Sequence, residues 1–590
     1  MASTDASEAT VSEPAKEHGL HDVSFARSLF QGDIHSELVV PFPALRQDDR
    51  KKVRSLITSL REFAATSYDA RKIEEQRWIG DDVIAGLGER GLCGLYVPTE
   101  YGGQGLSQTG YCRVSEEFGV IDGTLAVVMG VHQSIGMKGI ALFGTDDQKG
   151  RFLPDLAAGR KLAGFALTEP EAGSDAYNIT TRAQREADGA WRLNGEKRWI
   201  GNGNKDVLCT FARVDESDGG GHIALIVTKD MEGLDSPFRY DTMGLLGNDL
   251  RHVVFNDVRV PPENVLGEPG DGFRIAMQIL NNGRMSLGTG AVGATKKLLD
   301  MAITHVSQRE QFGRPLADFE LVEEKISWMT SYLFGLEAMS YLTTGLVDEG
   351  STDYAIESAM VKVAATEFIW YAANRAFQLA GGLAYMRDQP YEKILRDIRI
   401  FPIFEGANDV LRAFIALSGL KPLGDELSGL AHLDLARPIS TIGTIAEYVV
   451  GRVQRGVMPD RLRGVHAEIG YLAEPVGDQA KQLRATGEQL LRRHGKDIID
   501  RQWHLKRLAH AATDLYAQVA VLSRVTALLE AQGVGASLQE RYIAETFCQR
   551  AAHRVRGALR QVEENDDDRM HAIAQVAYKR GGYGYELYGS

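Results

Sequence analysis

The chain has 590 residues, of which 44% are hydrophobic and 25% charged, a composition typical of a globular protein with several domains. Its formal net charge of -14 disfavours nucleic acid as a main partner, because phosphate backbones repel an acidic protein. The four cysteines are scattered without metal-ligand spacing, so the sequence indicates neither a disulfide framework nor a metal site.

The N-terminal segment is polar and acidic and lacks an apolar core, so we expect a disordered leader at residues 1–22 and not a targeting peptide. No segment reaches the roughly 18 continuous apolar residues that a membrane span needs. We therefore expect a cytoplasmic protein. In residues 23–162, apolar residues recur at spacings of three and four, which predicts an N-terminal helical domain.

The pattern changes twice more along the chain. Short β-rich runs separated by turn signals predict a β-barrel-like middle domain at residues 163–268. The helical period then returns and predicts a helical bundle at residues 269–420. A Gly/Pro-rich joint near Lys421 leads into an appended helical domain at residues 421–590. The predicted fold is mainly α with one β domain, and it excludes a doubly wound dinucleotide fold, in which strands and helices alternate.

Two segments of the β domain have both an ordinary and a functional interpretation. "FALTEPEAGSDA", residues 165–176, follows a strand, and by itself it is a loop. Thr168, Ser174 and the glycine between them could instead hold phosphate or ring heteroatoms. Trp199 stands before a glycine-rich turn, where an aromatic residue most often packs within a strand.

Two segments of the helical bundle are similarly ambiguous. Arg309 and Arg314 flank a Phe-Gly pair, where an arginine is commonly solvated but could grip a pyrophosphate with its planar fork. Gly381 and Gly382 follow a long predicted helix. They are typical of a helix stop, and they would also permit close approach of the backbone to a ligand.

One carboxylate follows a markedly apolar run. Residues 400–404 are apolar, and Glu405 and Gly406 come directly after them. Alone, Glu405 is typical of an acid at the N-terminus of a helix, here one beginning near Ala407. The apolar run favours partial burial, which raises the pKa of a carboxylate and suits it to proton abstraction. Gly406 would leave room for a flat substrate.

Taken in this order, the motifs resemble the acyl-CoA dehydrogenase family of flavoproteins. The likeness runs from about Ser24 to the C-terminus. It rests on "VPTEYGGQG", "LTEPEAGSDA", "RWIGNG", "VRVPPENVLGEPGDGF", "NNGRMSLGTGAVG", "REQFGRP", "QLAGGLAY" and "LRDIRIFPIFEGANDVLR". The appended helical block, with "QWHLKRLAHAATDLYAQVAVLSR", resembles the very-long-chain branch of that family.

The resemblance implies FAD, held between the β domain and the helical domains. Arg309, Phe312 and the segment 378–382 match residues that reach the cofactor of a neighbouring subunit, which implies a homodimer or a dimer of dimers. The positions that the resemblance assigns to the cofactor are Phe165, Leu167, Thr168, Gly173, Ser174, Trp199, Gly201, Arg309, Phe312, Gln378, Gly381, Gly382, Ala407 and Asp409.

The resemblance also implies the reaction, the α,β-dehydrogenation of a long-chain fatty acyl-CoA to trans-2-enoyl-CoA in fatty-acid β-oxidation. Glu405 matches the catalytic base that takes the α-proton, while the flavin accepts the β-hydride. An electron-transfer flavoprotein would then accept the electrons. The positions assigned to the substrate are Ser174, Asn281, Arg284, Phe404 and Gly406.

Two positions depart from the family pattern. Gly201 stands where Thr or Ser is usual, and Ala407 stands where Thr is common, so each removes a polar contact to the cofactor. Gly130, Gly136 and Gly139 permit either a deep acyl pocket or merely close helix packing.

Other functions remain open at this point. The alternatives are an acyl-CoA oxidase, which passes electrons to oxygen, and a flavoprotein that serves as an assembly or scaffold protein. A DNA-associated relative is disfavoured by the net charge. The extension further implies peripheral contact with a membrane, although no strongly basic amphipathic face supports this.

Overall fold

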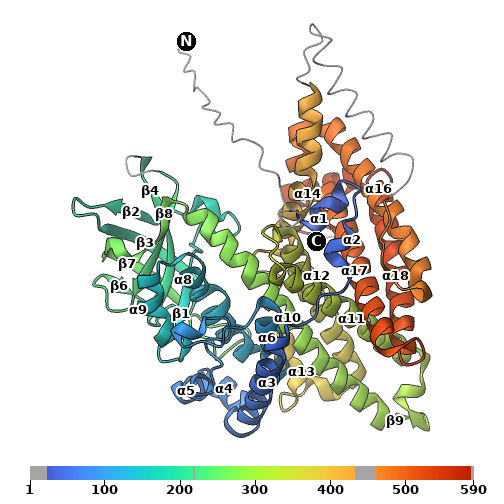
Figure 1. Cartoon of the computed structure of the whole chain (residues 1–590), viewed down its shortest axis with the longest axis horizontal. Helices are drawn as coiled ribbons and strands as arrows, with labels where there is room; N and C mark the ends of the chain where they lie inside the picture. The colour runs from blue at the N-terminus through green and yellow to red at the C-terminus, as the bar shows by residue number, and fades with distance from the viewer. Residues whose placement is uncertain (1–22, 217–219, 432–459, 586–590) are drawn as a thin grey trace.

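The computed structural model describes residues 23–216, 220–431 and 460–585, without side chains for 427–431. The predicted leader at residues 1–22 lies outside the described residues. Figure 1 shows the sheet at one end of the molecule, the long C-terminal helices at the other, and the blue helices of residues 47–89 below. The predicted fold, mainly helical with a β middle domain and an appended helical block, is confirmed.

Amphipathic helices build the N-terminal region. Val53, Leu56 and Leu60, spaced three and four residues apart, are buried on one face of the first long helix. Further along, the Asp122 carboxylate caps an apolar helix by accepting a hydrogen bond from the amide of Thr124. The helices are α3 (Gln47–Ser67), α4 (Ala70–Gln76), α5 (Asp81–Glu89), α6 (Gln108–Ile121), α7 (Gly123–Gly130), α8 (Lys138–Phe143) and α9 (Asp146–Ala157).

The helical stretch Gly123–Phe143 is long and apolar enough to cross a membrane by length and composition. It joins α7 to α8 through a π-helical segment, Val131–Gly136. In the folded protein, 67% of its most apolar 18-residue segment is buried. It packs against α10 (Gly272–Gln308) and the first strand of the sheet, so it is accounted for as a core helix.

The middle domain is one sheet of eight strands in the order β6-β7-β3-β2-β4-β5-β8, with β1 beside β4. β6 and β8 form its two edges within the described residues. The register of β3 against β7 shifts between Lys197 and Ile200, and Trp199 lies in this bulge with φ of +59°. The strands are β1 (Ala163–Ala166), β2 (Arg182–Arg185), β3 (Trp191–Gly201), β4 (Val207–Val214), β5 (His222–Thr228), β6 (Leu234–Asp235), β7 (Leu250–Val260) and β8 (Val265–Gly270).

The helical bundle is organised around α10, which packs against α6 and α12. In Figure 1 α10 is the long green helix that runs from the sheet into the bundle. It therefore connects the β domain to the helical half of the molecule. The remaining helices of the bundle are α11 (Glu320–Asp348), α12 (Ala355–Ala380), α13 (Pro390–Ile398) and α14 (Asn408–Ala431).

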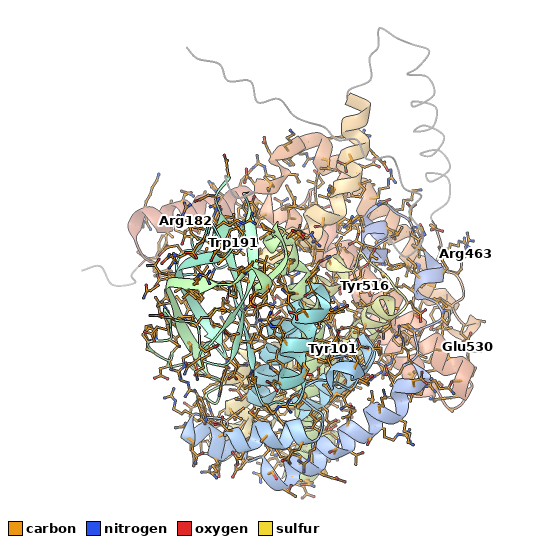
Figure 2. The ribbon with its side chains drawn as sticks, turned by 60° about the vertical axis from the view of Figure 1, so that its left-hand side comes forward. Tyr101, Arg182, Trp191, Arg463, Tyr516 and Glu530 are labelled. Atoms are coloured by element: carbon orange, nitrogen blue, oxygen red, sulfur yellow. The ribbon has the colours of Figure 1, made fainter. Side chains whose placement is uncertain are left out.

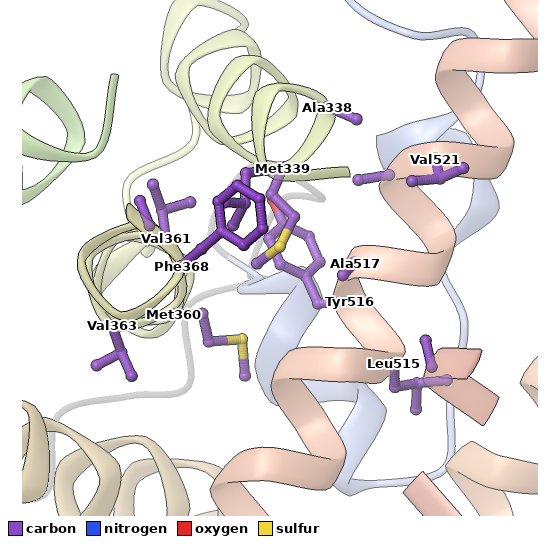
Figure 3. Packing of buried hydrophobic residues seen from close by; sticks show 14 of the residues in the cluster. Ala338, Met339, Met360, Val361, Val363, Phe368, Leu515, Tyr516, Ala517 and Val521 are labelled. Atoms are coloured by element: carbon purple, nitrogen blue, oxygen red, sulfur yellow. The ribbon is translucent and has the colours of Figure 1, made fainter. Parts of the chain in front are cut away.

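The appended helices share one apolar core with the bundle. Figure 3 shows Tyr516 pointing toward Met339 and Phe368, and its hydroxyl lies 2.8 Å from Thr343 Oγ1. Trp191 and Tyr516 are the largest fully buried side chains, and Figure 2 shows them in the sheet and among the helices, respectively. The appended helices are α16 (Gly470–His494), α17 (Gln502–Gln532), α18 (Leu538–Arg560) and α19 (Asp567–Arg580).

Two features near the expected domain boundaries differ from the sequence pattern. The Gly/Pro-rich segment near Lys421 is helical, because α14 continues through Pro422. Its neighbours Leu420 and Leu423 are both buried, so packing outweighs the local preference of proline for a helix end. At the other end of the chain, α1 (Phe25–Phe30) packs mainly against α14 of the bundle and α16 of the appended block.

Candidate active site

A cavity of about 1280 Å³ lies where the sheet, the N-terminal helices and the bundle meet. Most of the predicted catalytic, cofactor and substrate residues line it, although they come from distant parts of the chain. Those that line the cavity are Phe165, Leu167, Thr168, Gly173, Ser174, Trp199, Gly201, Asn281, Arg284, Phe404, Glu405, Gly406 and Ala407.

Among the acidic residues that line this cavity, Glu405 is the predicted base. Its Oε2 atom is buried and has no hydrogen-bond partner among the described residues. Burial raises the pKa of Glu405 from 4.5 to about 7, although the positive charges of Arg284 and Lys362 act in the opposite direction. A carboxylate with this pKa and an unpartnered oxygen is suited to take a proton from a bound ligand near neutral pH.

The backbone around Glu405 forms a tight turn of unusual conformation. Glu405 and Gly406 have φ of +58° and +96°, in the left-handed region that favours glycine. Two cations hold the carbonyl groups of this turn. Arg284 Nε donates to the Glu405 carbonyl at 3.2 Å, and Lys362 Nζ donates to the Gly406 carbonyl at 2.8 Å. The strained turn is therefore fixed from α10 and from α12.

Sequence reasoning missed two residues of this arrangement. Gly283 leaves space for the base, because a Cβ at this position would lie 2.5 Å from Glu405 Oε2. Lys362 is fully buried on α12. The signal for Lys362 was present, since it is a single charge within the otherwise apolar run "SAMVKVAA". No local signal distinguishes Gly283 from the other glycines of α10.

Trp199 and Gly201 form part of the wall on the side of the sheet. The Trp199 side chain is 51% exposed and lines the cavity, so an aromatic surface is available to a planar ligand. At Gly201, a Cβ would lie 3.0 Å from a methyl group of Val131. Gly201 stands where the resemblance leads us to expect Thr or Ser. Its lack of a side chain permits the close contact with the π-helical segment.

A buried ion pair shapes the turn that follows β1. Lys197 Nζ donates to the Leu167 carbonyl at 3.0 Å and to Glu169 Oε1 at 2.7 Å. Burial opposes ionisation of Glu169, but the charge and hydrogen bond of Lys197 and the bonds from Thr180 and Thr181 lower its pKa to about 2. This pair ties the turn, and with it the predicted cofactor contacts, to β3.

The remaining predicted residues lie away from the cavity. Phe312 is 95% exposed, and the Cβ positions of Gly381 and Gly382 meet nothing within 4 Å. Asp409 accepts a hydrogen bond from Arg412. Because these assignments to a cofactor involve surface positions of one chain, they stay predictions. The exposed residues are Arg309, Phe312, Gln378, Gly381, Gly382 and Asp409.

From the base, the cavity continues along one face of α10. Gly283 lies beside Glu405, and Lys297, fourteen residues later, also lines the cavity. Fourteen residues are almost four turns and about 21 Å of helix. Between these ends the lining residues of α10 include the small Gly290, Ala291 and Ala294. The site therefore includes a long extension along α10, lined there partly by small apolar residues.

The three glycines considered for a deep acyl pocket have different environments. Gly130 lines the cavity. A Cβ at Gly136 would lie 2.7 Å from the backbone of Ala163, and one at Gly139 would lie 2.9 Å from Ile279. Close packing therefore accounts for Gly136 and Gly139, while Gly130 contributes to the cavity.

Comparison with known families finds four matching family models. Three describe acyl-CoA dehydrogenases: the N-terminal domain at residues 50–160, the middle domain at 164–258 and the C-terminal domain at 270–420. The fourth is the ACAD9/ACADV C-terminal domain at residues 468–583. The matches follow the three-part body and the appended helices in chain order.

Individual relatives agree with the family models. The very long-chain specific acyl-CoA dehydrogenase of Bos taurus is 36% identical over 95% of this chain and 88% of its own. An acyl-CoA dehydrogenase of Bacillus anthracis, solved with FAD, superposes with a TM-score of 0.78 at 28% identity, covering 93% and 94% of the two chains. The butyryl-CoA dehydrogenase of Megasphaera elsdenii matches 64% of this chain and 99% of its own, with a TM-score of 0.60 and 31% identity.

Proposed function

This chain belongs to the acyl-CoA dehydrogenase family, and on this premise we propose that it converts a long-chain fatty acyl-CoA to trans-2-enoyl-CoA in FAD-dependent β-oxidation. The observation that carries the proposal is the buried Oε2 of Glu405, which has no hydrogen-bond partner among the described residues. Buried polar atoms normally have partners, so this one is available to a ligand.

The residues on the sheet side of the cavity fit FAD. Trp199 offers the face or edge of an exposed ring, and the turn after β1 contributes Thr168 and Ser174 as hydroxyl donors. When bound, FAD supplies the acceptor for the hydride that leaves the β-carbon of the substrate. The protein supplies position and electrostatics.

Proton abstraction is the task of Glu405. A bound thioester presents its α-hydrogen, and the carboxylate accepts that proton. Burial makes the carboxylate a stronger base than it is in water. Arg284 holds the Glu405 carbonyl, and its second contact, from Nη1 to Asn281 Oδ1 at 2.8 Å, fixes the guanidinium itself. The base is therefore oriented before the substrate arrives.

The turn also offers donors for the thioester carbonyl. Within the described residues, the amides of Glu405 and Gly406 donate to no protein acceptor. A thioester oxygen bound there would receive one or both hydrogen bonds as negative charge develops on it. Donors of this kind stabilise the enolate-like transition state and make the α-proton easier to remove.

The extension along α10 supports a long acyl chain as substrate. Its length of about 21 Å from Gly283 to Lys297 and its small lining residues leave space for an extended hydrocarbon. Burial of each methylene contributes about 0.8 kcal/mol, so affinity should rise with chain length until the extension is filled.

Anaerobic bleaching of the flavin by a series of acyl-CoAs tests this function. Wild type should bleach best with long chains, while Glu405→Gln, which retains the shape of the side chain without a basic carboxylate, should bleach hardly at all. Equal bleaching by both proteins would remove Glu405 from the role of base.

The partners belong to the same proposal. An electron-transfer flavoprotein as acceptor is supported by the family resemblance. Phe312 lies at the tip of the short β9–β10 hairpin (Glu310–Gln311 and Arg314–Pro315) and is almost entirely exposed to solvent. An exposed aromatic ring of this kind supports contact with a second subunit, in a homodimer or a dimer of dimers. Cytoplasmic location and peripheral membrane contact stay predictions.

A further inference from the structure

Lys362 lies beneath the turn that carries the base. It is fully buried on α12, with 0% of the residue exposed. Its ammonium donates to the Gly406 carbonyl and to Asn408 Oδ1, each at 2.8 Å. A buried lysine is unfavourable unless polar groups surround its ammonium, so these two contacts make the site specific for this side chain.

We propose that Lys362 is a positioning residue for proton abstraction: its ammonium holds the Glu405–Gly406 turn in its left-handed conformation and supplies buried positive charge that favours ionised Glu405. The proposal rests on the function proposed above. It concerns the chain's own residues, because Lys362 touches the turn and not the substrate or cofactor.

The mechanical part of this role follows from the turn. Glu405 has a positive φ, which is unfavourable for a residue with a side chain and persists only where surrounding contacts impose it. Arg284 on α10 donates a hydrogen bond to the Glu405 carbonyl, and Lys362 on α12 donates one to the Gly406 carbonyl. The side-chain oxygen of Asn408, at the start of α14, accepts a hydrogen bond from the same ammonium. Lys362 thus joins the turn to the helix that follows it.

The electrostatic part depends on every charge that faces the turn. On the α10 side, Arg284 is the charged group. On α12 and α14, Glu367 and Arg412 form an ion pair with each other, so their fields largely cancel. Arg412 also donates to His510 of α17 at 2.9 Å.

His510 and Asp409 complete the set of groups around the turn. Burial lowers the pKa of His510 to about 4, so it is neutral near pH 7. Asp409 is exposed and pairs with Arg412. The net field at the base therefore comes mainly from two cations, Arg284 and Lys362, and both lower the pKa of Glu405 against the effect of burial.

Removing the Lys362 charge should therefore raise the pKa of Glu405. Burial lowers the pKa of Lys362 to about 7, although the charge of Glu405 acts in the opposite direction. Lys362 therefore titrates near neutral pH itself. The two groups stabilise each other's charged forms. Without the ammonium, the carboxylate should become ionised only at higher pH, and proton abstraction should shift with it.

The test measures proton abstraction without hydride transfer. A 3-thia-acyl-CoA has sulfur at the β position, so it cannot lose a β-hydride, but its α-hydrogens can exchange with deuterium oxide. Exchange is followed by mass spectrometry against pH in the FAD-loaded wild type, Lys362→Met and Lys138→Met. Lys138 is the matched control: it is also buried, but its ammonium lies over the Tyr96 ring and the residue does not line the cavity.

The midpoint of exchange in Lys362→Met should lie about one pH unit above that of wild type, since a neighbouring charge shifts a pKa by one unit or more. Lys138→Met should retain the wild-type midpoint. An unchanged midpoint in folded, FAD-loaded Lys362→Met overturns the proposal. If wild type shows no exchange at any pH and no bleaching by acyl-CoA, the proposed function itself fails.

A second variant covers the case in which Lys362→Met does not fold. Asn408→Asp preserves the shape of the partner side chain and places a carboxylate 2.8 Å from the ammonium. Pairing with this carboxylate should weaken the field of Lys362 at Glu405 and again raise the midpoint of exchange. A midpoint equal to that of wild type in folded Asn408→Asp would also overturn the proposal.

Discussion

The carboxylate of Glu405 lies directly against the backbone of Gly283: a Cβ at Gly283 would stand 2.5 Å from Oε2 and 2.9 Å from Ile135. These residues are separated by more than a hundred positions in the chain, yet the space for the base exists only because one of them has no side chain. The position of the base is thus determined jointly by α10 and by the turn before α14.

Gly283→Ala should therefore displace the carboxylate while leaving the fold intact. A misplacement of the base by about 1 Å is expected to slow flavin bleaching by acyl-CoA on the order of 100-fold. Gly290→Ala is the control on the same helix, because the nearest atom to its Cβ is 4.0 Å away. Both variants are measured with a short-chain acyl-CoA, because Gly290 lines the extension that a long chain would fill. Stopped-flow bleaching measures both. If the two variants react equally fast, Gly283 does not govern the position of the base.

Glu405→Gln should become more stable than wild type as the pH rises. Folding raises the pKa of Glu405 from 4.5 to about 7, so the stability associated with its protonated form is complete below about pH 4.5 and is lost as the pH rises through about 7. The Glu405→Gln variant has no titrating group at this position, so its stability does not fall in this pH range. The difference in free energy of unfolding should grow toward high pH by at most about 3 kcal/mol.

Thermal unfolding of both FAD-loaded proteins at pH 5 and pH 8 measures this difference. The melting temperature of the variant relative to wild type should be higher at pH 8 than at pH 5. A difference that is the same at both values would mean that Glu405 is ionised in the folded protein throughout this range.

The sequence alone predicted much of this site, and the reason lies in local pattern. Glu405 follows a continuous apolar run, and Trp199 precedes a glycine-rich turn, so each could be identified from its neighbours in the chain. The predicted fold followed from changes in periodicity. Ordered motifs with a family resemblance then assigned the substrate and cofactor.

Tertiary contacts account for what the sequence did not reveal. Gly283 and Lys362 act on a turn that is distant in sequence, and no spacing rule connects them to Glu405. Likewise, the burial of Leu420 and Leu423 overrides the proline signal in α14. Local propensity is a weak guide wherever packing against another element decides the outcome.

The fate of the electrons separates a dehydrogenase from an oxidase. With a long-chain acyl-CoA in air, the protein should reduce an artificial electron acceptor and release little hydrogen peroxide. The same turnover measured without the acceptor is the control and should be slow. Peroxide formed at every turnover would identify an oxidase that carries out the same proton abstraction at Glu405.

Ala294→Phe should shorten the preferred acyl chain. Ala294 lines the extension along α10, about 16 Å of helix from Gly283. A phenyl ring there would displace the distal methylenes of a long chain, each of which contributes about 0.8 kcal/mol. The kcat/KM for long chains should fall while that for short chains is retained. An equal fall for all lengths would indicate general damage to the site and not a blocked extension.

Phe312→Asp should weaken self-association and FAD retention together. Phe312 has φ of +54° and is 95% exposed between β9 and β10, although its ring lies edge-to-face with Phe319 at 6.2 Å between centroids. A single chain therefore leaves most of this aromatic residue in solvent. Its predicted role at a neighbouring subunit requires a second copy. A charge at this position should lower the sedimentation coefficient and the ratio of flavin to protein. Tyr578→Asp, an exposed aromatic residue on α19, is the control and should change neither. A wild type that sediments as a monomer with full FAD content would contradict the role assigned to Phe312.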